Sequence, residues 1–345
     1  MTSPTKTQRQ LRYLLLGTLF VWAFLLNISY GSVEISIRNI IESVMGNNLQ
    51  EPQLDYIIHQ YRIPKAITAV IVGAGLSISG LLMQTLFKNP LAGPYVLGVS
   101  SGASLGAALY LMGASALSAF LPHWLMGNWS TTIAASIGSF SVLFIVAAVA
   151  TRIKNTMALL IIGLMFGSLS SAIVSILAFF SSKESLQRFV FWTYGNLGNL
   201  RPSEIGILGL FVGIGSLLSI LNTNALNTML LGDDYAISLG VSLKKTHLII
   251  LITTGLIAGS ITALVGPIAF LGLAVPHICR LIWDTSNHKI LIPTCLIMGA
   301  IFMLISDSIA QLPGSANVLP INAVTALFGS PIVIWLLIRK KQIQL

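Results

Sequence analysis

One short stretch of the chain holds most of the side chains that could bind a metal ion. His277 and Arg280 follow Pro276, and Asp284 and His288 lie close behind them in sequence. A closed metal site needs about four well-placed ligands, and this stretch has too few. A cation near a helix end can instead bond the last backbone carbonyls. The pattern therefore predicts helix-end roles for His277 and Arg280 and no metal site.

Asp307 is the one acid well inside a long apolar stretch. A carboxylate within a membrane span often belongs to a proton or ion path. No basic partner is evident in the spans, so we favour capping or an interhelical hydrogen bond over a proton relay. Cys279 and Cys295 lack metal-ligand spacing and flank a predicted cytoplasmic loop, where disulfides are disfavoured. We expect both to be ordinary helix residues.

Nucleotide hydrolysis is excluded for this chain by its motifs. The phosphate loop G-x-x-x-x-G-K-[ST] does not occur, and no glycine is followed by lysine. The apolar stretches also hold no cluster of His, Asp and Ser, which disfavours a membrane-embedded enzyme. The chain is predicted to be neither an enzyme nor the holder of a cofactor. If ATP drives its function, ATP and Mg²⁺ bind to a partner chain.

The elements that must position these residues are membrane-spanning helices. Only 8% of the 345 residues are charged and 55% are hydrophobic, with a mean hydropathy of +0.86, whereas a soluble domain carries about a quarter charged residues. The charge-free runs, at about 20 residues per span, give about ten helices. Breaks are expected at Leu121–His123, at Gly266-Pro267 and at Leu312–Gly314 with Pro320. The prediction is an all-α polytopic protein with a single transmembrane domain, 1–345.

Orientation follows from the placement of Lys and Arg. With both termini in the cytoplasm, thirteen basic residues lie inside: Lys6, Arg9, Arg12, Lys88, Arg152, Lys154, Lys244, Lys245, Arg280, Lys289, Arg339, Lys340 and Lys341. Six lie outside: Arg38, Arg62, Lys65, Lys183, Arg188 and Arg201. This bias explains the net charge of +9. Because the cations are scattered over many loops, no nucleic-acid partner is expected.

The predicted cytoplasmic loop at about 226–245 has its own pattern. Gly232, Ala236 and Gly240 recur every four residues, and Asp233 and Asp234 precede a helix-forming segment. Acids at a helix N-terminus interact favourably with its dipole. We expect the small residues to leave a shallow face on which another protein sits; an ordinary solvated loop is the alternative.

Ordered motifs from about residue 55 to the C-terminus resemble the permease family that imports iron siderophores, haem and cobalamin. They are RIPK (62–65), GAGLSISG (73–80) with Gln84, NPLAGP (89–94), LGVSSGA (97–103), LLGDDYAISLGV (230–241), GPIAFLGLAVPHICR (266–280), LPIN (319–322) and GSP (329–331). The resemblance implies a FecCD-like transmembrane subunit of an ABC importer in the bacterial inner membrane.

The resemblance also implies roles for individual residues. The ATPase-coupling segment would include Gly232, Asp233, Asp234, Ala236, Leu239 and Gly240. Asn89, Leu91, Thr156 and Met157 would line a cytoplasmic gate, although Asn89 fits a turn before Pro90 equally well. Arg62 and Lys65 would form an exposed cation pair that docks a binding protein, or would anchor the helix at the membrane interface. Gln311 stands where the family has another basic residue, so part of that docking patch is expected to be missing or moved.

The implied assembly comprises a second permease chain (identical or a paralogue), two ATPase subunits and a periplasmic or lipid-anchored substrate-binding protein. The path would run between the two permease chains, lined by the fifth and tenth helices. The expected cargo is an iron complex, with ferric siderophore ahead of haem and cobalamin. An ion-coupled secondary transporter is the rival from another class, and the scarcity of intramembrane charge weighs against it.

Overall fold

The computed structural model describes residues 6–46, 51–113, 129–153, 156–311 and 317–338, and every regular element in these ranges is a helix. The predicted breaks at Leu121–His123 and Leu312–Gly314, together with Lys154 and the C-terminal cations Arg339, Lys340 and Lys341, lie outside the described residues.

Seven of the helices described are long and apolar enough to cross a membrane. They are α1 (Lys6–Ser29), α4 (Ile63–Leu86, preceded by α3, Pro52–Ile57, and η1, Ile58–Arg62), α7 (Ser130–Ala150), α8 (Thr156–Phe180), α10 (Pro202–Leu221), α13 (Leu243–Val265) and α15 (His288–Ala310). Three shorter apolar helices accompany them: α5 (Val99–Leu111), α14 (Leu271–Trp283) and α16 (Ile321–Ile338). The expectation of an all-α protein with about ten apolar helices is confirmed.

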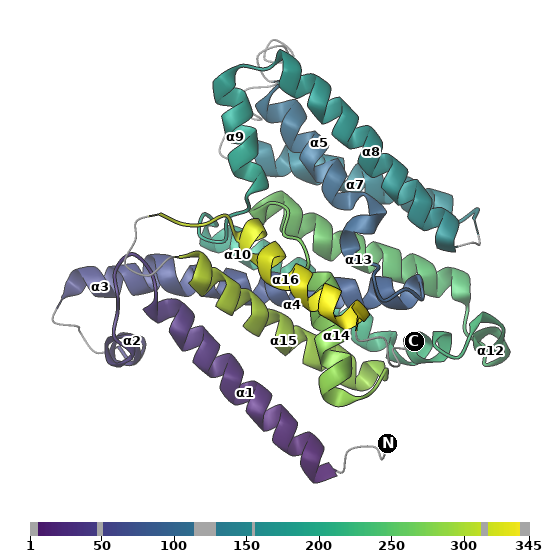
Figure 1. Cartoon of the computed structure of the whole chain (residues 1–345), viewed down its shortest axis with the longest axis horizontal. Coiled ribbons are helices and arrows are strands. Elements are labelled where there is room, and N and C mark those ends of the chain that lie inside the picture. Colours follow the sequence, from purple (N-terminus) through teal and green to yellow (C-terminus); the bar gives the residue numbers. More distant parts are fainter. Residues whose placement is uncertain (1–5, 47–50, 114–128, 154–155, 312–316, 339–345) are drawn as a thin grey trace.

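Short helices connect these elements, most of them at the two ends of the bundle. They are α2 (Ile37–Val44), η2 (Pro94–Leu97), α9 (Lys183–Thr193), α11 (Thr223–Met229) and α12 (Asp233–Ser238). The Arg12 guanidinium on α1 donates to the carbonyl of Ile282, 2.7 Å away at the end of α14. One end of the bundle therefore holds the first turns of α1 and α15, the last turn of α14, and α11 (Figure 1). We call it the α12 end.

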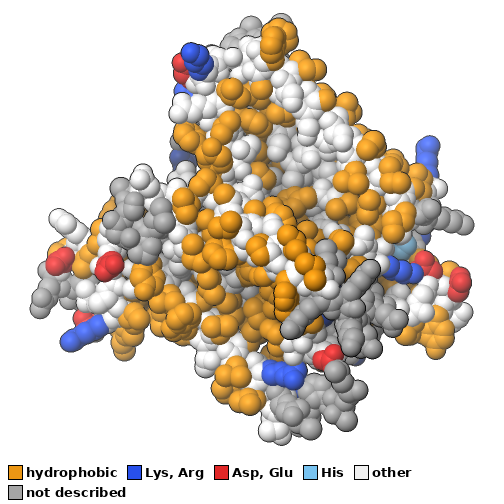
Figure 2. Space-filling view, viewed as in Figure 1, with side chains coloured by type: hydrophobic (Ala, Val, Ile, Leu, Met, Phe, Trp, Pro, Cys, Tyr) orange, Lys and Arg blue, Asp and Glu red, His pale blue; other side chains and the backbone are white. Residues whose placement is uncertain are grey.

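The core is built around α4, α13 and α15. In the apolar windows of these helices, 83%, 72% and 61% of the residues are buried, against 17% in α8 and 22% in α1. On the face shown in Figure 2, hydrophobic side chains cover much of the outside of the bundle, as expected where lipid or another chain replaces water. This inversion of the usual pattern explains why mean hydropathy is so high.

Small residues allow the closest helix crossings. Gly102 on α5 lies against Gly138 on α7, and Gly106 lies against Ala134, at distances that leave no room for a Cβ atom. Gly102 and Gly106 stand four residues apart, and both lie at this helix contact. Gly209 and Gly213 have the same spacing, but the space beside Gly213 is open.

Candidate functional site

The segment predicted to contact another protein folds as two short helices, α11 and α12, at the α12 end. Asp233 begins α12, as the sequence predicted, and its carboxylate lies 2.8 Å from the Lys88 ammonium after α4. Gly232 and Gly240 bracket α12 with φ of +108° and +83°, a region that other residues avoid. Their role is to turn the chain sharply at both ends of the helix.

The expectation of a shallow face made by Gly232, Ala236 and Gly240 is wrong. Ala236 has no exposed surface, because the short helix turns this residue inward. The exposed side chains of the segment are large and apolar: Leu231, Tyr235, Ile237 and Leu239, each 55–64% exposed. We call these four residues the α12 surface. In Figure 2, hydrophobic side chains lie beside acidic ones at the position that α12 occupies in Figure 1.

A chain of hydrogen bonds connects this segment to the core. Asn227 on α11 accepts through Oδ1 from the backbone N–H of His288, at 2.8 Å, and its Oδ1 lies 2.9 Å from His288 Nδ1. The other ring nitrogen of His288 lies 2.8 Å from the Thr85 hydroxyl on α4. Asn227 also donates to Asn287, at 3.0 Å. We call Asn227, His288 and Thr85 the polar relay. Sequence reasoning missed it, since the three residues lie in separate motifs.

The predicted gate residues occupy two element ends. Asn89 and Leu91 lie in the loop between α4 and η2, where Asn89 Oδ1 accepts from the Leu91 N–H at 2.9 Å and closes a tight turn. Thr156 and Met157 begin α8, and Leu91 and Met157 are 42% and 49% exposed. The turn role of Asn89 is therefore confirmed, and the gate role stays a prediction.

His277 bonds this loop and Arg280 bonds α4. His277 Nε2 lies 2.8 Å from the carbonyl of Pro90, and Arg280 donates to Gln84 Oε1 at 2.6 Å. Gln84 in turn points its amide toward the carbonyl of Leu273, 3.3 Å away. Arg280 thus bonds a side chain of α4 instead of its own helix end. Among the described residues, no three His, Cys, Asp or Glu side chains gather closely enough for a metal ion.

The exposed cation pair predicted at Arg62 and Lys65 does not exist as such. Arg62 is only 7% exposed and donates to Gln311 Oε1 at 2.6 Å and to the carbonyls of Tyr30 and Val33. Lys65 pairs with Asp307 at 3.0 Å, so Asp307 does have a basic partner in the spans. The interhelical bonding expected of Asp307 is confirmed, because Asn27 on α1 also donates to it.

Two breaks in the chain meet inside the bundle. The first runs through η2 to Gly98, and the second runs from Gly266 to Phe270, where both terminal residues have positive φ. Tyr95 accepts at its hydroxyl from the N–H of Ile268 at 3.1 Å. Asn322 at the start of α16 accepts from the N–H of Ala269 at 3.0 Å. Irregular backbone at membrane depth requires such partners or a cavity, and both are present here.

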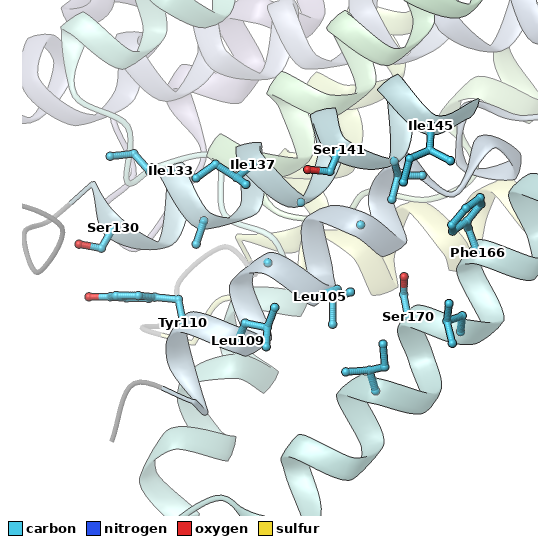
Figure 3. Close-up of a pocket in the computed structure, with 17 residues that line it drawn as sticks. Leu105, Leu109, Tyr110, Ser130, Ile133, Ile137, Ser141, Ile145, Phe166 and Ser170 are labelled. Atoms are coloured by element: carbon cyan, nitrogen blue, oxygen red, sulfur yellow. The ribbon is translucent and has the colours of Figure 1, made fainter. Parts of the chain in front are cut away.

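Three pockets lie beside these elements. One of about 450 Å³, lined by serines together with apolar residues, adjoins the two breaks between α5 and α8. An apolar one of about 480 Å³ lies between α5, α7 and α8, lined mostly by residues such as Leu105, Leu109 and Ile137 (Figure 3). A third, of about 580 Å³, lies beside α12 and contains Arg152 and Lys244 at its wall.

The chain matches the sequence profile of the FecCD transport family over residues 19–339. It is 33% identical to the vitamin B12 import system permease protein BtuC of Shigella boydii, over 99% of this chain and 100% of the relative. Identity is 36% with the BtuC of Klebsiella pneumoniae, over 82% and 83% of the two chains. A solved metal-chelate type ABC transporter in an inward-facing conformation superposes with a TM-score of 0.81 at 27% identity, covering 94% of this chain and 97% of the other.

Proposed function

We propose, from the premise that the chain belongs to the FecCD transport family, that it moves an iron complex, foremost a ferric siderophore, into the cell by alternating access. The chain is a multi-pass permease subunit of an ABC importer in the bacterial inner membrane, and it transports rather than catalyses. Its ATPase and binding protein are separate chains.

The α12 surface carries the mechanistic part of this proposal. The α12 surface consists of four exposed apolar side chains on a turn at one end of the bundle. Ionic side chains at this end are typical of a boundary that faces water, and exposed apolar side chains in water need a protein partner. An ATPase subunit seated on Leu231, Tyr235, Ile237 and Leu239 covers them. Gly232, Asp233, Asp234, Ala236 and Gly240 shape the turn that presents this surface.

Movement of α12 reaches the core through the polar relay and through the Lys88–Asp233 pair. The relay connects α11 to α15 and α4, and Lys88 immediately precedes the gate residue Asn89. Binding of ATP and Mg²⁺ to two partner subunits then shifts the loop that holds Asn89 and Leu91 relative to the α8 start at Thr156 and Met157. The bundle rocks as packed units, which is how such transporters alternate access.

A second permease chain, identical or a paralogue, completes the path along α8 and α16. The low burial of α8 supports an additional partner for this helix besides lipid. The thirteen-to-six asymmetry of basic residues supports a cytoplasmic position for both termini and for the α12 end. The opposite end of the bundle, where α2 lies, then faces the binding protein. Docking by Arg62 and Lys65 stays a prediction; the contacts of Arg62 support a different role, which is to hold residues 30–33 against α4.

Cobalamin and haem are the alternative cargoes within the same importer type. The names of the BtuC relatives support cobalamin, and the metal-chelate description of the solved neighbour supports a metal chelate. An ion-coupled secondary transporter is the candidate from another class. It would need ionisable groups facing the path, whereas Asp307 and Lys65 neutralise each other within one bundle.

Reconstitution with and without the partner chains tests the proposal. The permease, its ATPase and its binding protein are placed in liposomes, and uptake of a ⁵⁵Fe-labelled ferric trihydroxamate, of haem and of cobalamin is measured. We expect ATP-dependent uptake of the iron chelate and none driven by an ion gradient alone. Gradient-driven uptake without the ATPase would overturn the importer mechanism.

Leu239→Arg tests the α12 surface directly. Leu239 is 59% exposed, so the substitution leaves the fold intact while placing a charge in the contact with the ATPase. We expect chelate-stimulated ATP hydrolysis and uptake to fall together. Ile41→Arg, on α2 at the opposite end and 45% exposed, is the matched control. It should leave ATP hydrolysis by the permease–ATPase complex without the binding protein unchanged, whereas Leu239→Arg should lower it. Equal effects of the two substitutions would contradict the assignment. Ala236 is unsuitable for this test because it is buried.

A further inference from the structure

The pocket beside α12 brings together basic side chains from two membrane-crossing helices. Arg152 follows the end of α7, Lys244 and His247 lie near the start of α13, and Ile237 comes from α12. We call this pocket, of about 580 Å³, the basic pocket. Figure 2 shows basic side chains and a histidine beside the acidic ones at the position that α12 occupies in Figure 1. Positive charge is thus gathered in a hollow at the α12 end of the bundle.

The charge of the basic pocket is not neutralised within the described part of the chain. Neither Arg152 nor Lys244 has an acidic side chain within ion-pair distance there. Asp233 is the one acid among the residues that line the pocket, and its carboxylate is already paired with Lys88 at 2.8 Å. Arg152 and Lys244 therefore leave an excess of positive charge, which favours an anionic ligand.

The basic pocket lies at the boundary of the membrane. α7 and α13 are both long and apolar enough to cross a bilayer, and the pocket is formed where α7 ends and α13 begins. Side chains at the ends of such spans lie at the level of the lipid headgroups, because about 20 apolar residues cross the hydrocarbon core. Basic pockets between membrane helices on the cytoplasmic side are typical binding sites for anionic headgroups.

An exposed stripe on α7 leads from the apolar exterior to the basic pocket. Its side chains recur every three or four residues, which places them on one face of the helix. They are Ile137, Ser141, Phe144, Ala148 and Thr151, followed by Arg152. Ile137 and Phe144 are 61% and 75% exposed. Figure 3 shows Ile137, Ser141 and Ile145 in a row along α7, beside the apolar cavity that α7 shares with α5 and α8.

The length of this stripe matches a lipid tail. At about 1.5 Å per residue, Ile137 lies about 20 Å along the helix axis from Thr151. An acyl chain that begins at the basic pocket can therefore lie on the apolar part of the stripe, while its headgroup stays beside Arg152. Polar and apolar binding surfaces are continuous along a single helix.

We propose that the basic pocket binds an anionic phospholipid of the cytoplasmic leaflet, whose phosphate group pairs with Arg152 and Lys244 and whose acyl chains lie along α7. The guanidinium offers a planar fork of donors that fits phosphate oxygens, and the ammonium adds a point charge. Inorganic phosphate or an acidic segment of the ATPase would match the charge alone. Neither covers the apolar stripe, so the lipid is the ligand that the whole surface favours.

The bound lipid lies next to the α12 surface without competing for most of it. Ile237 lines the basic pocket, whereas Leu231, Tyr235 and Leu239 do not. The ATPase can cover these three side chains while a lipid occupies the pocket. An occupied pocket holds α12 against the ends of α7 and α13. ATP-driven uptake should therefore rise with the content of anionic lipid, whichever cargo is carried.

Native mass spectrometry of the permease–ATPase complex tests the binding site. The complex in detergent is titrated with phosphatidylglycerol, and with phosphatidylcholine as the zwitterionic control. Arg152→Gln combined with Lys244→Gln should weaken binding of phosphatidylglycerol about thirtyfold, because two basic contacts are lost. Lys245→Gln combined with Lys289→Gln removes two exposed cations at the same end but outside the pocket, and should bind as the wild type does. Equal losses in the two pairs, or equal binding of the two lipids by the wild type, would overturn the proposal.

Competition and transport separate the lipid from the other sources of negative charge. Excess inorganic phosphate should not displace phosphatidylglycerol, because phosphate gains nothing from the stripe; displacement would reduce the pocket to a site for free anions and overturn the proposal. In liposomes, uptake by the wild type should rise with the fraction of phosphatidylglycerol, and uptake by the Arg152→Gln, Lys244→Gln variant should not.

Two further outcomes are distinguishable. If this variant loses its ATPase in phosphatidylcholine nanodiscs while its lipid binding is unchanged, the pocket is an ATPase contact and the proposal is wrong. If the wild-type importer accumulates none of the chelates with ATP, the proposed function fails, while the lipid titration still decides whether the site exists.

Discussion

Replacing Asp307 by asparagine should destabilise the bundle more than any change to an exposed ion pair. Lys65 Nζ lies 3.0 Å from Asp307 Oδ1, and the two side chains are 18% and 3% exposed. Asn27 and Gln311 each donate to Asp307 Oδ2 at 2.9 Å. Asparagine keeps the shape of the side chain but removes its charge. The Lys65 ammonium is then left half-paired inside the bundle.

The size of the effect follows from the separation and the burial. Two unit charges at this distance attract by about 5 kcal/mol at an effective dielectric constant of about 20. Removing one member of a buried pair typically costs about 3–5 kcal/mol, because the remaining charge stays desolvated. We expect Asp307→Asn to lower the free energy of unfolding by about this amount. Lys65→Met combined with Asp307→Asn should recover part of it, because the unpaired ammonium is removed, whereas the buried Arg62 guanidinium still lacks the negative charge of Asp307.

Unfolding of the purified chain in mixed micelles, followed by circular dichroism against the mole fraction of denaturing detergent, measures these differences. Glu42→Gln is the matched control: Arg38 and Glu42 are 2.8 Å apart, but their side chains are 85% and 38% exposed. Such a pair contributes little, so the midpoint of unfolding should not move. The reasoning is refuted if Asp307→Asn is no more destabilising than Glu42→Gln, or if adding Lys65→Met brings no recovery.

Three further outcomes are expected. Gly80→Ala should lower the free energy of unfolding by about 1–3 kcal/mol or more, because its new Cβ would overlap the backbone of α14. Gly206→Ala, which has open space beside it, should be neutral in the same unfolding assay. Asn227→Ala should leave ATP hydrolysis by the assembled importer intact while reducing the amount of chelate taken up per ATP. An unchanged ratio of chelate taken up to ATP hydrolysed would contradict a role of the polar relay in transmitting movement. Lys88→Gln should leave stability nearly unchanged, because Lys88 and Asp233 are 45% and 48% exposed, and a clear fall in the unfolding midpoint would show that the pair is more than a surface contact.

Local properties of the chain were open to prediction from the sequence. Membrane residence follows from the scarcity of charge, because each ionised side chain carries its own solvation cost wherever it lies. The start of α12 at Asp233 and the end of α13 before Gly266 follow from capping and backbone preferences within a few residues. The turn at Asn89 is of the same kind. These features depend only on near neighbours in sequence.

Pairing between distant residues was decided by tertiary structure. Lys65 and Asp307 lie 242 positions apart, and nothing local to Lys65 indicates that α15 will neutralise it. Ala236 looked like part of an exposed small face, yet the turn between Gly232 and Gly240 directs it inward and exposes Leu239 instead. Helical periodicity over six residues is too short to assign an inner face.

The α12 surface and the pocket between α5 and α8 show the same difference between what the sequence predicts and what the structure decides. Sequence alone determined that this is an all-helical membrane chain without a phosphate loop, and its ordered motifs indicated the permease family. Tertiary structure decided which side chains form each surface, because α5 and α8 bring serines some 70 residues apart to one cavity. A serine in a membrane helix can satisfy itself with its own backbone, so its presence in the sequence does not reveal whether it faces lipid, protein or a path.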